Sequence, residues 1–268
     1  MSGVYEFIFS YAFLGAFWSL SALFIASLLV GRLSNLKFKS QPFYATGIGY
    51  LQIIASTNLA YFVMREFAIS YDFFGLIAGI FLVSVILVCR QIFTKYVSSD
   101  LELSGEPSIL NEVIYWTSVL FIFFIVWYAH IVEPNPSAGF DFFHIWIPEY
   151  ASISAKVGFF LTEKNMSLGS GLLSSGGLYY QPNLLGIVAL APLFGWEDQL
   201  YPVYIGSGAL ADFLTIVILI EAFRNKPIST FMFLCLVLLF LKFGTAHSVM
   251  LLNTGFDHVL PLCGSIII

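Results

Sequence analysis

Charged residues are scarce in this sequence: only 10% of its 268 residues are Asp, Glu, Lys or Arg, whereas 59% are hydrophobic. In soluble domains the charged fraction is about a quarter. A soluble domain of this length could not hide so much apolar surface. Several uninterrupted apolar runs reach the roughly 20 residues that are needed to cross the hydrocarbon core of a bilayer. The composition therefore predicts an all-α polytopic membrane protein.

Basic residues and cysteines are also few. The 11 Lys and Arg residues are spread thinly and form no basic patch, which argues against nucleic acid as a partner. The three cysteines, Cys89, Cys235 and Cys263, lie in separate apolar runs without the spacing of a metal site or a disulfide framework. We expect them to be small core residues.

The apolar runs predict a single transmembrane domain over residues 1–268. The run 183–196 is short for a full span and is expected to be re-entrant or tilted. The chain ends partway into an apolar run, so we expect the sequence to be the N-terminal portion of a longer protein. The other predicted helices cover residues 4–30, 43–64, 73–93, 113–132, 202–223 and 228–243, with the start of another at 258–268.

Basic loop residues predict the orientation of these helices. Arg90 closes the third run, and the loop after the first run is basic, so the positive-inside rule places both in the cytoplasm. Four crossings then place the segment 133–182 on the outer side of the membrane. The basic residues of the first loop are Arg32, Lys37 and Lys39.

The direction of the run 202–223 depends on the short run before it. If 183–196 does not cross the membrane, Arg224 and Lys226 lie in the cytoplasm, as the positive-inside rule favours. If it does cross, both residues lie outside, against that rule. We favour the first arrangement.

The outer segment combines acids with aromatic residues in the stretch GFDFFHIWIPEYA. On a helix, Asp141 and Glu149 would share one face, and His144 lies between them in the sequence. A carboxylate near the membrane surface can act as a general base on an acceptor hydroxyl, or help to hold a divalent metal ion against a phosphate. The alternative is a helix that lies in the headgroup layer, with its aromatic rings in lipid and its charges toward water.

This stretch resembles the first outer loop of the C-type, multi-spanning glycosyltransferases, which often reads Trp-Asp-Ala and then Trp-x-Pro-Lys-Ala. Asp141, Trp146 and Pro148 match that spacing. Phe140 replaces the usual Trp, and Glu149 stands where Lys is common. These departures put the role of the missing lysine in question.

Two further partial matches follow in the same order as in that class. The class often has a Tyr-Pro-Pro-Leu step that opens a short helix, and YYQPNLLG here supplies Tyr180 and Pro182. The Phe194-Gly195 turn after it is also similar. Many members carry Gly-Tyr-Ala-Asp further along, where TGFDHVLPL supplies Asp257, one residue shorter.

The resemblance implies a GT-C-like helix bundle with amphipathic helices in its outer catalytic loop. It also implies transfer of a sugar, with inversion, from a polyprenyl-phosphate donor to a lipid, glycan or protein acceptor, as in the protein O-mannosyltransferases and the lipid A aminoarabinose transferase. The active site would face outward from the bacterial inner (plasma) membrane, in contact with membrane lipids. The catalytic residue that the resemblance implies is Asp141. The other candidate catalytic residues in the sequence are Glu149 and His144, and the candidate substrate-binding residues are Trp146, Lys156, Lys164, Tyr180 and Asp257.

Within that resemblance, Asp141 would be the base that orients or deprotonates the acceptor. Lys156, Lys164 or a divalent metal ion (Mg²⁺ or Mn²⁺, held by Asp141 and Glu149) would neutralise the leaving phosphate. Each side chain also has a simpler explanation. His144 could bond a loop carbonyl, Glu149 could lie on a solvated helix edge, Asp257 could cap a helix, and Trp146 and Tyr180 could belong to the aromatic belt of the membrane interface.

Two acids in the run 202–223 bear on other functions. Asp212 falls inside the run, where an acid is costly and usually faces a cavity or a partner. Together with the short run 183–196, it suits a transporter or flippase for lipid-linked or amphipathic substrates. Glu221 lies near the end of the run and is expected to extend its carboxylate toward water. A non-catalytic member of the family is the third possibility.

Overall fold

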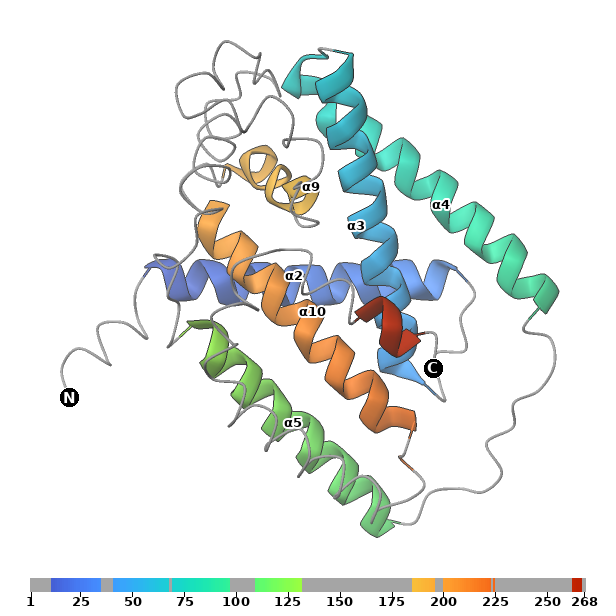
Figure 1. The fold of residues 1–268 in the computed structure, drawn as a ribbon, viewed down its shortest axis with the longest axis vertical. Helices are drawn as coiled ribbons and strands as arrows, with labels where there is room; N and C mark the ends of the chain where they lie inside the picture. Colours follow the sequence, from blue (N-terminus) through green and yellow to red (C-terminus); the bar gives the residue numbers. More distant parts are fainter. Residues whose placement is uncertain are drawn as a thin grey trace.

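The computed structural model describes residues 11–34, 41–67, 69–96, 109–131, 185–195, 200–222, 224 and 262–266. Every regular element in these ranges is helical (Figure 1). The long helices are α2 (Tyr11–Leu33), α3 (Pro42–Glu66), α4 (Phe74–Tyr96), α5 (Ile109–Ile131) and α10 (Leu200–Ala222). The short ones are η1 (Tyr71–Phe73), α9 (Leu185–Val188) and η4 (Ala191–Phe194), and residues 262–266 are also helical.

Four of the described helices, α2 to α5, are long and apolar enough to cross a membrane. Their candidate spans are 19 to 23 residues long, which matches the roughly 20 residues that a helix needs to cross the hydrocarbon core. Helix α10 is mostly apolar and has the same length as α2, 23 residues. The prediction of a helical protein is confirmed for the described residues, and four of their helices have the length and composition of membrane-spanning segments.

The start of helix α5, which is polar, differs from the predicted boundary. The predicted helix 113–132 begins four residues earlier than expected, because α5 starts at Ile109. Glu112 lies in the first turn of this helix. A carboxylate is favoured there because the first backbone N–H groups of a helix have no partner in the helix and carry partial positive charge.

The run 183–196 contains two short helical pieces, α9 and η4, of four residues each. At 1.5–2.0 Å per residue, neither piece can cross a hydrocarbon core about 30 Å thick. Gly195 ends η4 with a φ of 73°, a left-handed conformation that glycine adopts readily. The predicted helix 228–243 lies outside the described residues.

Helices α2 and α3 approach each other through small residues. A Cβ atom added at Gly49 of α3 would collide with the carbonyl of Ser27 in α2, and one added at Gly31 of α2 would collide with the carbonyl of Ala45. Gly206 brings α10 against α2 in the same way. Such close backbone contact is how helices associate in lipid, where burial of apolar surface gives little driving force.

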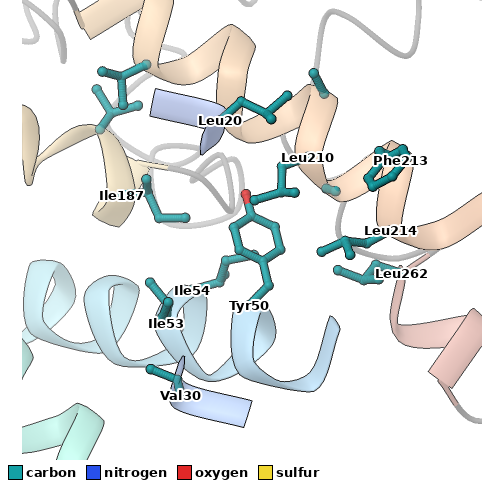
Figure 2. Packing of buried hydrophobic residues seen from close by; sticks show 14 of the residues in the cluster. Leu20, Val30, Tyr50, Ile53, Ile54, Ile187, Leu210, Phe213, Leu214 and Leu262 are labelled. Carbon is teal, nitrogen blue, oxygen red and sulfur yellow. The ribbon is translucent and has the colours of Figure 1, made fainter. Parts of the chain in front are cut away.

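Helix α3 is the centre of the bundle, packed against α2, α4, α9 and α10. Its Tyr50 is fully buried, and the phenol ring lies among apolar side chains from α2, α3 and α10 (Figure 2). The Tyr50 hydroxyl donates a hydrogen bond of 2.8 Å to the backbone carbonyl of Ser207 in α10. The apolar neighbours visible around it include Leu20, Ile54, Leu210 and Leu214.

Helix α4 lies at the edge of the bundle (Figure 1). Only 11% of its candidate span is buried, and its outward side chains are large and apolar, as a lipid-facing helix requires. Cys89 in this helix is only partly buried, and so is Cys263, so the expectation that these two cysteines belong to the core is wrong. The exposed apolar residues of α4 include Leu76, Ile80, Val83, Leu87, Val88 and Ile92.

Candidate functional site

The predicted site residues all lie outside the described residues. This applies to the catalytic set, to the two residues proposed to hold a metal ion, and to the residues proposed to bind substrate. The helices that precede and follow the segment 133–182, α5 and α9, are described. The residues concerned are Asp141, His144, Trp146, Glu149, Lys156, Lys164, Tyr180 and Asp257.

The segment 133–182 begins after α5 and ends before α9, and both of these helices can be placed. The end of α5 lies beside the start of α2, because Phe17 and Trp127 pack edge to face with ring centroids 5.7 Å apart. The start of α10 lies there too, because Gly206 contacts the backbone of Ala16. These contacts gather the end of α5 and the starts of α2 and α10 at one end of the bundle.

Helix α9 is held beside the second half of α3. The backbone N–H of Gly186 donates a hydrogen bond of 2.9 Å to the side-chain oxygen of Asn58. Tyr71, which precedes α4, donates its hydroxyl hydrogen bond to the carbonyl of Ala189. Gly186 also lies against the backbone of Thr57 and Asn58, so only glycine fits this contact. The segment that follows 133–182 is therefore fixed toward the end of α3 and the start of α4.

The opposite end of the bundle contains a buried carboxylate, Glu221 of α10. Its oxygens accept hydrogen bonds from the backbone N–H groups of Phe43 (3.3 Å) and Tyr44 (2.9 Å) and from the hydroxyl of Tyr115 (3.3 Å). Only 5% of Glu221 is exposed. The prediction that this side chain extends to water is therefore wrong, because the start of α3 and Tyr115 of α5 supply donors inside the bundle.

An ion pair lies next to Glu221 and joins α5 to the residue after α10. Arg224 donates two hydrogen bonds of 2.7 Å to the two carboxylate oxygens of Glu112. Its guanidinium also lies 4.8 Å from the centre of the Tyr115 ring. Trp116 adds a hydrogen bond of 3.2 Å to Glu112. The bonds to Glu112 raise the pKa of Arg224 above its usual value, so the guanidinium stays charged.

These contacts fix the relative directions of the helices. The starts of α3 and α5 and the end of α10 meet around Glu221 and Arg224 (Figure 1). Helix α10 therefore runs opposite to both α3 and α5. This is the arrangement expected if the run 183–196 does not cross the membrane.

The sequence at the start of α3 indicates that this helix needs an acceptor such as Glu221. Helix α3 starts with Pro42, and the residue before it is Gln41, which is not among the residues that commonly cap helices. A helix without a local cap needs acceptors from elsewhere for its first N–H groups, or water. The sequence could show that a cap was missing, but not which distant side chain would provide it.

Asp212 lies on α10 and is partly buried. It is close enough to Tyr50 of α3 for its charge to act on the phenol group. Among the residues that the structure describes, no three His, Cys, Asp or Glu side chains lie close enough together to hold a metal ion.

Comparison with known proteins finds no matching family model, no matching curated protein and no matching solved structure. The resemblance to the multi-spanning glycosyltransferases therefore rests on the three sequence motifs. What the structure adds is the arrangement of the helices on either side of the first motif.

Proposed function

We propose that this protein is a membrane glycosyltransferase that moves a sugar from a polyprenyl-phosphate donor to an acceptor on the outer side of the membrane. The proposal rests on the ordered motifs around Asp141, Tyr180 and Asp257. The acceptor is a lipid, a glycan or a protein. The donor tail would lie in the bilayer beside the helices, and its phosphate would lie at the membrane surface.

The arrangement of the helices supports this proposal. The end of α5, which precedes the motif segment, lies away from the end of the bundle that contains Glu112 and Arg224. The basic residue Arg32 lies in the last turn of α2, and α3 starts beside Glu221. By the positive-inside rule this basic end faces the cytoplasm, so the segment 133–182 would start on the outer side.

The proposed chemistry is a single displacement with inversion. The acceptor hydroxyl attacks the anomeric carbon, the bond between that carbon and the phosphate oxygen breaks, and the phosphate leaves on its lipid. Asp141 takes the hydroxyl proton as general base. Lys156 or Lys164 would stabilise the negative charge that develops on the leaving phosphate.

The test is Asp141→Asn in membranes supplied with radiolabelled polyprenyl-phosphate sugar. Removing a general base should lower the rate of sugar transfer by about 10²-fold or more. Asp72→Asn is the matched control, because Asp72 is an exposed acid in η1 between α3 and α4. Transfer that is unchanged in the Asp141 variant would overturn the proposal.

A second candidate, a transporter or flippase for lipid-linked or amphipathic substrates, is favoured by one observation. Asp212 is partly buried within the 23-residue helix α10. Acids inside a span commonly mark substrate or ion pathways. Flipping of a labelled lipid that is abolished by Asp212→Asn and unaffected by Asp141→Asn would support this candidate against the transferase.

A further inference from the structure

Helix α3 begins at Pro42, and the residue before it is Gln41, which is not a residue type that commonly caps helices. Pro42 occupies its first position, and the N–H of Ala45 donates a backbone hydrogen bond of 3.1 Å to the carbonyl of Gln41, one turn earlier. The N–H groups of Phe43 and Tyr44 fall between these two. In most helices a Ser, Thr, Asp or Asn at the N-cap accepts from such groups.

Glu221 supplies the missing acceptors. It bonds both of these N–H groups, one with each carboxylate oxygen. Because the carboxyl group is almost fully buried, no water layer weakens these hydrogen bonds.

The same carboxylate also accepts from a third helix. Tyr115 of α5 donates its hydroxyl to the oxygen that receives the Phe43 N–H, and the Tyr115 side chain is itself completely buried. Arg224, three residues after Glu221, also contacts α5, because it donates two hydrogen bonds to Glu112. Glu221 thus joins the end of α10 to both α3 and α5, and Arg224 adds a second connection to α5.

We propose that Glu221 is an interhelical cap, supplied by α10 to the start of α3, and that this joint couples movements of α10 to the first turn of α3. Withdrawal of the carboxylate removes the acceptors of the N–H groups of the buried Phe43 and the half-buried Tyr44, so α3 and α10 must shift together or the first turn of α3 must open. The Glu112–Arg224 pair at the same end holds α10 to α5 and has no such effect on α3.

The joint is tested by hydrogen–deuterium exchange of the full chain in lipid nanodiscs, followed in peptides that cover the starts of α3 and α5. In Glu221→Gln, amide exchange in the first turn of α3 should rise by about tenfold, the change that corresponds to loss of a cap. Glu221→Asp keeps the charge on a shorter side chain and should give a smaller increase. If Glu221→Gln does not fold, Glu221→Asp decides the matter alone.

The matched control is Glu112→Gln, which changes a carboxylate at the same end of the bundle that is not the acceptor of the Phe43 and Tyr44 N–H groups. We expect faster exchange at the start of α5 and unchanged exchange at the start of α3. Equal increases in both helices for both variants would mean that Glu221 only stabilises the bundle as a whole. Unchanged exchange of α3 in the Glu221 variants would also overturn the proposal. Neither result depends on the transferase assay of Asp141.

Discussion

The hydroxyl group of Tyr50 in α3 donates a hydrogen bond of 2.8 Å to the backbone carbonyl of Ser207 in α10. Both residues are completely buried. This contact joins the central helix to a residue 157 positions further along the sequence. The apolar side chains packed around it include Leu20, Leu210 and Leu214 (Figure 2).

Replacing Tyr50 by Phe should destabilise the protein by about 1 kcal/mol, because the hydrogen bond is lost while the ring is retained. The measurement is reversible unfolding in mixed micelles. Tyr44→Phe is the control, because Tyr44 is only partly buried and its change should stay within about 0.5 kcal/mol. Equal losses of unfolding free energy in the two variants would show that the hydrogen bond to Ser207 does not stabilise the protein.

Replacing Gly49 by Ala should destabilise the pair α2–α3 by roughly 1–3 kcal/mol or more, because the added methyl group collides with the carbonyl of Ser27. Backbone atoms cannot yield as a side chain can. The matched control is Gly79→Ala in α4, where the same methyl group would meet nothing within 4 Å.

Gly79→Ala should be neutral or stabilising by up to about 1 kcal/mol, since alanine favours the helix. Unfolding in mixed micelles measures both variants. A Gly49→Ala protein as stable as Gly79→Ala would contradict the close approach of α2 and α3.

Replacing Arg224 by Lys should cost about 0.2–1 kcal/mol, because lysine keeps the charge but cannot make the two parallel bonds to Glu112. The pair is partly open to solvent, with 22% and 28% of the two side chains exposed, so its contribution is modest. High salt should reduce the difference between the variant and the parent. A double-mutant cycle with Glu112→Gln measures the coupling, and a coupling of zero would contradict the bonded geometry.

Replacing Gln52 by Met should be tolerated, with a change within about 1 kcal/mol. The Gln52 side chain is buried, and its Nε2 has no hydrogen-bond partner among the described residues. Removing such a group relieves a desolvation penalty. The Ser34 hydroxyl, which donates to Gln52, can donate to the carbonyl of Val30 instead, at 3.0 Å.

Ser34→Ala is the contrasting variant. It leaves the whole Gln52 amide buried without this partner and should cost about 1–3 kcal/mol. Thermal unfolding in mixed micelles compares the two variants. A larger loss for Gln52→Met than for Ser34→Ala would show that the Gln52 amide has a stabilising role that these contacts do not explain.

The positions of the long helices could be predicted from sequence because apolar runs near 20 residues have few alternatives in a membrane protein. The errors fall at helix ends. Helix α5 extends to Ile109 because its first turn accepts Glu112, which hydropathy alone assigns to a loop. The candidate catalytic residues, with Asp141 first among them, remain predictions from the sequence motifs.

The interior contacts could not be predicted in the same way. Glu221 looked like an acid near a helix end, and nothing local in the sequence links it to Tyr44. The Gln-Pro step at Pro42 indicates that the first N–H groups of α3 need an acceptor from elsewhere. Any acidic or polar side chain in the chain could have been that acceptor. Only the packing of α10 against α3 and α5 selects Glu221.

The sequence by itself determined that this protein is helical and built for a bilayer, and where most of its long helices lie. It did so because hydrocarbon demands runs of apolar residues with satisfied backbone groups, and that demand is local. The tertiary structure alone decided which glycines allow helices to touch and which buried acid completes α3. These choices depend on groups far apart in the chain meeting within about 3 Å, a condition that no local pattern records.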